Sequence, residues 1–488
     1  MLARARGVLF LAALLFVGIT IVHYGALYLF SPTHKAAINT HKDVERQSLS
    51  PLELAAFCAK LQSRPRPDRV QKVKAAPSVE SWDPTKYLNS GPAEYFRDNL
   101  RQDKFYITAW SNAGFTNQFM SYVNMIYMGL VSERIPIVPP FGPDHHIPHD
   151  AGIIPFGDIF NLSRAREAMH TPILEWRDLK HLPSLKSGQA PPAEEREQLG
   201  CWSTRPGNNP NPLRVSSVVD HLKLDISYTR IPTESRVNPS DGNDDHLVFS
   251  KLVRYIYPKR PLPPPNGRYT LMEKSPLGHE LLPDHHMTCF DFLYYGTSSP
   301  ETYEWKFSWA PAWTMVGKHL HFTDKMVELA TGYLARALGA FPDQLPHFIA
   351  VHMRRGDFAN QCWDTPGNCL IPLSKFERRV NEMKLELWEK YSIVVKEVVL
   401  MSDEEDPEFW EEIRYLGWTR IDHEEEQTVK RYGHWYPPLV DIVAQSMASG
   451  FIGTHDSTFS LVSGRRVEDW NNKPAAFVAK NDKDVYYW

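Results

Sequence analysis

The stretch Phe348-Ile-Ala-Val-His-Met-Arg-Arg-Gly-Asp-Phe358 decides the fold of this chain. It opens with an apolar run of strand length, from Phe348 to His352, and charged residues follow at once. In an open α/β sheet, ligands bind beyond the carboxyl ends of the strands. Arg354 is therefore expected where a ligand binds, and its planar, permanently charged guanidinium suits a diphosphate. A structural Arg–Asp ion pair at a strand end is the alternative.

Strand and helix patterns alternate on both sides of this stretch. Before it, a helix is expected from Thr323-Asp324 to Gly339. After it, strands are expected at 398–401 and 451–453, and helices at 407–416, 439–448 and 457–465. Such alternation predicts a parallel sheet with helices on both faces.

The pattern strand, helix, strand also occurs early in the chain. It consists of a strand at 105–110, a helix marked by apolar residues between Phe119 and Leu130, and a strand at 135–138. The middle third is less regular and gives no topology. We therefore expect an α/β protein with two Rossmann-like domains, 101–320 and 321–488, that face a cleft.

The N-terminus predicts a membrane anchor. Arg4 and Arg6 precede an apolar run from Gly7 to Val22 that continues more weakly to Phe30. Positive charge is retained on the cytoplasmic side, so residues 1–30 are expected to form a transmembrane signal anchor that leaves the body in the lumen. This makes a single-pass type II membrane protein of the endoplasmic reticulum or Golgi, with 31–100 as a polar stalk. A cleaved signal peptide is the alternative.

The net charge and the cysteines indicate which partners and which compartment suit this protein. The 488 residues carry a formal net charge of -4, which leaves no basic field for nucleic acid. Among five cysteines, Cys362 and Cys369 bracket a short loop and are expected to form a disulfide in an oxidising lumen. Cys58, Cys201 and Cys289 remain unassigned. A glycosylation sequon occurs at Asn161.

Two further segments have the pattern strand, polar turn, helix start. The first, Asn112-Ala-Gly-Phe-Thr-Asn-Gln118, offers free backbone N–H groups at a helix N-terminus, although a simple cap by Thr116 or Asn117 is the alternative. The second is Phe451-Ile-Gly-Thr-His-Asp-Ser-Thr-Phe-Ser460, where Ser457 and Thr458 can cap the helix and donate to phosphate oxygens.

Together, the three segments resemble the GDP-fucose protein O-fucosyltransferase family in order and spacing. The first resembles the family segment that ends in Phe-x-Asn-Gln, and Val138-Pro-Pro140 follows it. The stretch from His352 to Phe358 resembles its His-x-Arg-x-x-Asp-Phe signature. The last resembles its Phe-Ile-Gly and Ser-Thr-Phe segment, with Asp441 upstream.

This resemblance implies a GT-B fold, GDP-fucose as donor, a protein or glycan hydroxyl as acceptor, inversion at the anomeric carbon, and no metal or cofactor. It implies catalytic roles for Arg354, at the β-phosphate, and for Asn117, at the cleft. It implies a nucleotide-sugar site formed by these two with Gly114, Phe115, Thr116, His352, Asp357, Asp441, Ser457, Thr458 and Phe459.

One departure leaves alternatives open. Some relatives carry a glutamate as general base in the first segment, where this chain has Ala113. The base is then either dispensable or a carboxylate from the middle region. A same-fold transferase that uses another nucleotide sugar, and a non-catalytic sugar-nucleotide or glycan-binding protein, are the competing interpretations. A metal site formed by His145-His146 with His149 and Asp150 is disfavoured because the spacing suits no helical pair.

Overall fold

The computed structural model describes residues 82–182, 191–209, 211–360 and 370–480. The predicted anchor at 1–30 and the predicted Cys362–Cys369 disulfide lie outside these ranges. Within them, no helix combines the length and hydrophobicity needed to cross a membrane.

The first lobe is built on a seven-stranded sheet with the order β3-β2-β1-β8-β4-β5-β7. Neighbouring strands run parallel except for β7, which is antiparallel to β5 and lies in the middle third, where the sequence gave no topology. The strands are β1 (Tyr106–Ala109), β2 (Ile135–Val138), β3 (Leu174–Glu175), β4 (Glu197–Ser203), β5 (Leu224–Arg230), β7 (Thr270–Glu273) and β8 (Met287–Phe290). A separate parallel pair joins β6 (Leu247–Val248) to β9 (Gly296–Thr297).

Helices cover both faces of this sheet because its strands alternate their side chains. Ile107 and Ala109 of β1 pack towards α5, whereas Tyr106 lies in the cluster on the opposite face. The helices of this lobe are α4 (Phe96–Asn99), α5 (Phe115–Ser132), α6 (Phe156–Ile159), α7 (Leu162–Met169), α8 (Trp176–Leu179), α9 (Ser216–His221), α10 (Phe249–Ile256) and α11 (Pro311–Met315).

The second lobe contains a five-stranded, wholly parallel sheet with the order β12-β11-β10-β13-β14. The strands are β10 (Phe348–Met353), β11 (Glu397–Ser402), β12 (Thr419–Arg420), β13 (Gly450–Thr454) and β14 (Ala475–Val478). The helices are α12 (Asp324–Ala337), α13 (Leu373–Tyr391), α14 (Pro407–Tyr415), α15 (Thr428–Tyr432), α16 (Tyr436–Ser446) and α17 (Thr458–Asn471). The parallel sheet and the helices predicted here are confirmed, with ends that differ by a few residues at most positions.

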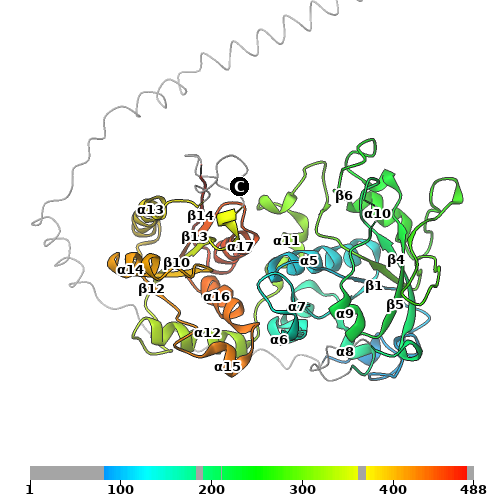
Figure 1. Cartoon of the computed structure of the whole chain (residues 1–488), viewed down its shortest axis with the longest axis horizontal. Coiled ribbons are helices and arrows are strands. Elements are labelled where there is room, and N and C mark those ends of the chain that lie inside the picture. The colour runs from blue at the N-terminus through cyan, green and yellow to red at the C-terminus, as the bar shows by residue number, and fades with distance from the viewer. Residues whose placement is uncertain (1–81, 183–190, 210, 361–369, 481–488) are drawn as a thin grey trace, which may run out of the picture. The chain divides into compact units, whose positions relative to one another are not determined.

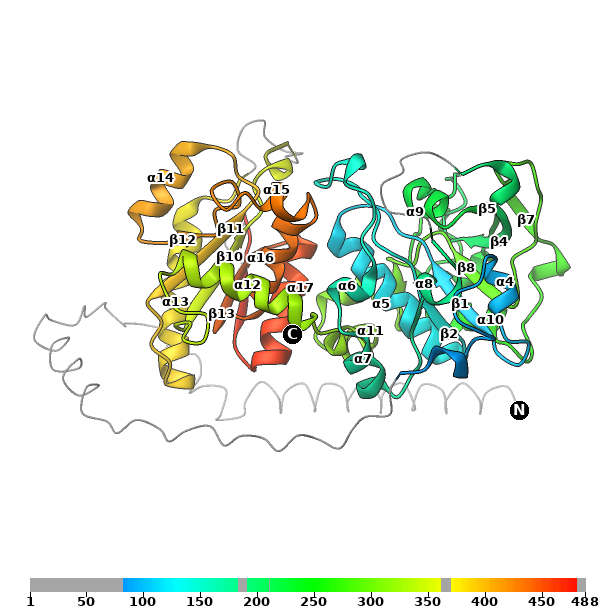
Figure 2. The same cartoon turned by 90° about the horizontal axis from the view of Figure 1, so that it is seen from below.

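The two lobes meet where α5 packs against α17 (Figures 1 and 2). One hydrophobic cluster extends from α5 through α17 to the second sheet, so the core is continuous across the lobes. Both helices begin at the polar turns singled out in the sequence. Their N-termini therefore bring the first and third motifs together.

The expected stalk boundary at residue 100 is too late. Phe96 is completely buried beneath the first sheet, and its N–H donates to Glu197 Oε2 at 2.8 Å. Asn99 is also buried and donates to the carbonyl of Leu179 at 2.8 Å. These partners are distant in sequence, so the local polar composition gave no sign that the segment packs onto the body.

A disulfide joins Cys201 on β4 to Cys289 on β8. The two strands are neighbours, with Trp202 opposite Phe290, although 88 residues separate the cysteines along the chain. Both residues are fully buried. Two of the three cysteines left unassigned by the sequence are therefore paired across the centre of the first sheet.

Loss of this bridge should destabilise the protein by about 2–4 kcal/mol, because a cross-link over a long loop restricts the unfolded chain. Denaturant melts of the wild type and of Cys201→Ala with Cys289→Ala are compared with and without reductant, because a Cys362–Cys369 link would respond to reductant in both proteins. We expect reductant to lower the midpoint of the wild type by more than that of the double variant. Identical wild-type midpoints with and without reductant would contradict the bridge.

Candidate active site

A cavity of about 1130 Å³ lies between the two lobes and receives residues from all three motifs. Every site residue expected from the sequence lines it: Gly114, Phe115, Thr116, Asn117, His352, Arg354, Asp357, Asp441, Ser457, Thr458 and Phe459. These residues come from the turn before α5, the end of β10, α16 and the start of α17. The structure thus brings together segments that are more than three hundred residues apart, as the Thr458–Asn117 contact shows most directly.

Arg354 is held at the end of β10 by both backbone and side chain. Its N–H donates to Thr454 Oγ1 at 2.9 Å, which ties it to the neighbouring strand β13. Its Nε and Nη2 donate to the two carboxylate oxygens of Asp357 at 2.7 and 2.9 Å, and Nε lies 3.3 Å from Asp403 Oδ2. Among the described residues no hydrogen bond reaches Nη1. The guanidinium is therefore oriented by acids and keeps one nitrogen available to a ligand.

His146 contacts the same guanidinium from the first lobe. Burial and the nearby Arg354 charge lower the pKa of His146, so its ring is neutral near pH 7 and Nε2 accepts from Arg354 Nη2. Burial alone would raise the pKa of Asp357, but the Arg354 hydrogen bonds outweigh it and hold that pKa below its usual value. The ionised Asp357 thus orients Arg354 within the second lobe, and the neutral imidazole of His146 links it to the first lobe.

His146, Asp357 and Asp403 each place one potential ligand atom within 4.8 Å of the others, a spacing that could hold a metal ion. This set differs from the His145-His146 pair considered from the sequence. The Arg354 guanidinium already contacts both carboxylates, so a cation compensates their charge within the protein. A divalent ion entering here would meet that positive charge.

The side chain of Arg355 points away from the cavity. Its guanidinium pairs with Glu404 and lies over the Phe409 ring, 4.2 Å from its centroid, and it does not line the cavity. Its backbone N–H donates to Asp403 Oδ1 at 2.7 Å. The two adjacent arginines are therefore distinct, one facing the cavity and one packed against α14.

The start of α5 forms the wall contributed by the first lobe. Gly114 is its N-cap, and no side chain caps it within the described chain, so the simple cap by Thr116 or Asn117 is not formed. Gln118 donates to the carbonyls of Ala113 and Gly142, at 2.8 Å each, and fixes the turn. Ala113 has a φ of 72°, a left-handed conformation that is uncommon for a residue with a side chain.

The start of α17 forms the facing wall. Ser457 is the N-cap, and its hydroxyl accepts from the N–H of Ser460. Thr458 donates from its hydroxyl to Asn117 Oδ1 at 2.7 Å across the cavity. The two helix N-termini, whose partial positive charge favours anions, therefore lie on opposite walls of one cavity.

A buried histidine and an aromatic ring adjoin this wall. His352 lies 2.7 Å from Ser460 Oγ through Nδ1, and its ring is 4.8 Å from that of Phe459. Burial lowers the pKa of His352 to about 3, so its ring is neutral. The two rings are tilted at 33° to each other and present an uncharged surface beside the start of α17.

Asp441 on α16 binds His423, with 2.9 Å between Oδ1 and Nε2. Burial opposes protonation of His423, but the Asp441 carboxylate outweighs burial and raises the pKa of His423 above its usual value. His423, His146 and Asp403 all line the cavity and were missed as cavity residues by the sequence reasoning. They follow strands or occupy loops, but without a signature that separates them from ordinary polar residues.

Residues 106–468 match the sequence model of GDP-fucose protein O-fucosyltransferases. The chain belongs to this family. GDP-fucose-dependent transfer of fucose, which the sequence predicted, is the activity of the family, and the prediction of an enzyme of this type is thereby confirmed. A search of curated proteins finds no match.

Three solved fucosyltransferase structures resemble the chain at low identity. POFUT1 in complex with GDP-fucose is 15% identical, with 77% of this chain and 98% of that chain covered and a TM-score of 0.49. NodZ α-1,6-fucosyltransferase soaked with GDP-fucose is 9% identical, with 78% and 98% covered and a TM-score of 0.39. NodZ from Bradyrhizobium is 10% identical, with 74% and 93% covered and a TM-score of 0.36.

The His423–Asp441 pair predicts a pH-dependent stability. Because the folded pKa of His423 is raised, its contribution is complete below the unfolded pKa near 6.5 and is lost as pH rises through the folded value. Asp441→Asn should therefore lower the free energy of unfolding more at about pH 5.5 than at about pH 8.5, by on the order of 1 kcal/mol. Denaturant melts measure this difference, with exposed Asp343→Asn as the control. A loss that is equal at both pH values would contradict it.

Proposed function

We propose that this protein is a lumenal, inverting fucosyltransferase with a GT-B arrangement, which moves fucose from GDP-fucose to a hydroxyl of a protein or glycan acceptor. The observation that carries this proposal is the meeting of the three motifs around one cavity, with Arg354 between two helix N-termini. The anchor predicted at residues 1–30 and the sequon at Asn161 support a lumenal body in the endoplasmic reticulum or Golgi. Asn161 caps α7 and is partly exposed.

The net charge of the cavity lining does not attract the negatively charged donor, so binding depends on individual hydrogen-bond donors and cations. Carboxylates outnumber cations along the lining, so a diphosphate depends on specific donors. Arg354 Nη1 and the N–H groups at the start of α17 would bind the β-phosphate, and the Ser457 and Thr458 hydroxyls adjoin them. The rings of His352 and Phe459 would support the base, and Asp441 lines the same side of the cavity.

In the reaction, the acceptor oxygen attacks C1 of fucose on the face opposite the diphosphate. The bond from C1 to the phosphate oxygen breaks, and its electron pair stays on GDP. Arg354 stabilises this growing negative charge, which is the electrostatic term that usually contributes most to such a step. Asn117, fixed by Thr458, would orient the reacting groups at the cleft.

The hydroxyl proton needs an acceptor other than Ala113. Asp456 lies in the turn before α17, is 63% exposed, and lines the cavity. A hydrogen bond from His455 is the main cause that lowers the pKa of Asp456, so it is ionised at neutral pH. We propose that Asp456 or bulk water takes the proton late, after C1 has gained oxocarbenium character, when even a weak base suffices.

The donor and the need for metal are tested in one assay with the full-length protein. Binding and turnover of GDP-fucose, GDP-mannose, UDP-glucose and UDP-N-acetylglucosamine are measured with and without EDTA. We expect GDP-fucose to be preferred and turnover to survive EDTA, because Arg354 provides the cation at the leaving group. Preference for another sugar nucleotide would support the same-fold alternative, and binding without turnover would support a non-catalytic protein.

Arg354→Ala should reduce transfer by on the order of 100-fold or more, because a leaving-group stabiliser is lost. GDP affinity should fall less than turnover, since the guanidinium acts mainly on charge that develops in the transition state. Arg354→Lys should recover only part of the rate, because it keeps the charge and loses the planar fork.

Arg355→Lys is the matched control, since its side chain lies outside the cavity, and it should retain most of the transfer rate. Thermal melting of all variants separates a lost role from unfolding, because Arg354→Ala leaves Asp357 and Asp403 without their shared cation. Near-normal transfer by Arg354→Ala would refute the assigned role.

A further inference from the structure

A second, smaller pocket of about 240 Å³ opens beside the donor cavity. The two share Tyr294, Asp456, Ser457 and Thr458 along their linings. Any acceptor must place its hydroxyl next to the donor, so a pocket that adjoins the donor cavity at the start of α17 is positioned to hold the acceptor. Its volume is below the roughly 300 Å³ at which drug-sized ligands begin to fit.

Aromatic rings form much of this pocket. Tyr295 stands at 89° to Tyr294 with 4.9 Å between ring centroids, and at 73° to Tyr303 with 5.9 Å. Trp305 is buried beside them, and its indole N–H donates a hydrogen bond to Asn124 Oδ1. Flat ring faces bind the C–H faces of a compact ligand and leave its polar edges free for other partners.

Two buried polar atoms in the lining have no hydrogen-bond partner among the described residues. Glu304 is only 2% exposed, and its Oε2 accepts from the N–H of Ser298 at 2.8 Å while Oε1 is unpaired. Nε2 of His246 is also unpaired. A buried polar atom without a partner costs about 1–3 kcal/mol, so each is expected to find one in a bound molecule.

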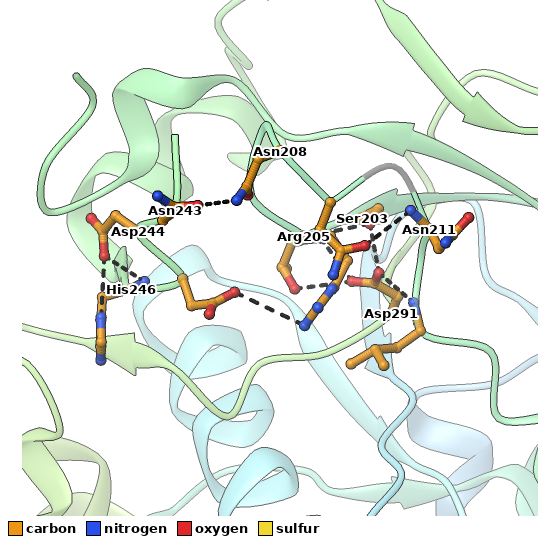
Figure 3. A network of polar contacts seen from close by, with 12 residues as sticks. Ser203, Arg205, Asn208, Asn211, Asn243, Asp244, His246 and Asp291 are labelled. Atoms are coloured by element: carbon orange, nitrogen blue, oxygen red, sulfur yellow. Dashed lines mark hydrogen bonds and ion pairs between the residues drawn. The ribbon is translucent and has the colours of Figure 1, made fainter. Parts of the chain in front are cut away.

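The orientation of His246 is fixed from outside the pocket. Asp244 accepts from the His246 backbone N–H at 2.9 Å and from Nδ1 at 3.1 Å (Figure 3). Hydrogen bonds from Asn238 and His246 outweigh burial and lower the pKa of Asp244, so it is an ionised acceptor and Nδ1 carries the proton. Nε2 is the ring nitrogen that remains without a hydrogen-bond partner among the described residues. Figure 3 also shows the surrounding loops held together through Asp291, which accepts from Ser203 Oγ at 2.6 Å.

Tyr303 stands at the edge of this arrangement in a strained conformation. It is 47% exposed and has a φ of 54°, which is uncommon for an aromatic residue. Its ring packs on His246 with 4.6 Å between centroids. Strain of this kind costs on the order of 1 kcal/mol and recurs at ligand sites.

We propose that this pocket is the acceptor subsite and that it takes a single pyranose ring, so that the acceptor is a carbohydrate. The ring faces of a pyranose pack on the tyrosines, and its hydroxyls can donate to Glu304 Oε1 and form a hydrogen bond with His246 Nε2. A purely apolar side chain would leave both atoms unpaired. This inference rests on the proposed function, because it places the acceptor hydroxyl beside the GDP-fucose cavity.

The test measures binding of methyl glycosides of common hexoses and N-acetylhexosamines to the full-length protein saturated with GDP. Saturable binding of at least one glycoside is expected. Tyr303→Ala should weaken it roughly tenfold and Tyr303→Phe by less than about threefold, because stacking needs the ring and not the hydroxyl. Glu304→Gln should weaken it about tenfold or more, since it replaces a charged acceptor in a nearly isosteric side chain.

The controls separate this proposal from the donor function. Tyr415→Ala removes a tyrosine that is 94% exposed and lines neither pocket, and it should leave glycoside binding unchanged. GDP affinity should be the same in all these variants, whereas a merely structural role for Tyr303 or Glu304 would lower GDP affinity and melting temperature together. In transfer assays, Tyr303→Ala should raise the acceptor KM and leave the GDP-fucose KM unchanged.

Two results would overturn the proposal while the donor function stands. One is normal GDP binding with no saturable binding of any glycoside. The other is transfer to peptide hydroxyls with an acceptor KM that Tyr303→Ala and Glu304→Gln do not change. Failure of GDP itself to bind would instead refute the proposed function.

Discussion

The position of α17 against α5 is the constraint on which the site depends. Arg466, in the middle of α17, is fully buried between the lobes, with its guanidinium 4.9 Å from the ring centroid of Phe119 and 4.5 Å from that of Phe322. Burial lowers the pKa of Arg466 to about 9, so it remains charged at neutral pH. No hydrogen bond reaches its side chain within the described residues. Cation–π contacts give about 2 kcal/mol or more each when desolvated, but desolvation of the charge costs several kcal/mol. Arg466 therefore mainly sets the position of α17 between the lobes.

That position decides how the two walls of the donor cavity face each other. Two turns of helix separate Arg466 from Thr458, whose hydroxyl reaches Asn117 across the cavity. A shift of α17 by one turn, about 5.4 Å, would break this contact and move the N-terminus away from Arg354. The polar contacts at the cavity are too exposed to hold the lobes alone. The apolar and aromatic packing behind them therefore sets the geometry that the chemistry uses.

The predictability of each part follows from the range of the interactions that form it. The strand at Phe348 and the cap at Thr323 were predictable because apolar runs and caps act within a few residues. The grouping of Arg354 and Thr458 was predictable because β10 and β13 end at one edge of the same sheet. The position of Asn117 across the cavity was expected only from the resemblance to the family, because Asn117 follows a strand of the other sheet. The pairing of Cys201 with Cys289 was not, because it requires the non-sequential order of β4 beside β8. Residues 82–100 were misread since their burial depends on partners such as Glu197.

Three residues near the two pockets have backbone conformations that their side chains do not favour. Ala113, Asp456 and Tyr303 all have positive φ values, of 72°, 64° and 54°. The first two lie in the turns that open α5 and α17, and the third lies at the smaller pocket. None is a glycine, which would adopt these conformations at little cost. In the case of Asp456 the side chain offers a reason, since a glycine there would remove the carboxylate that lies between the two pockets. Strain at this position is thus tied to an acidic group that lines both pockets.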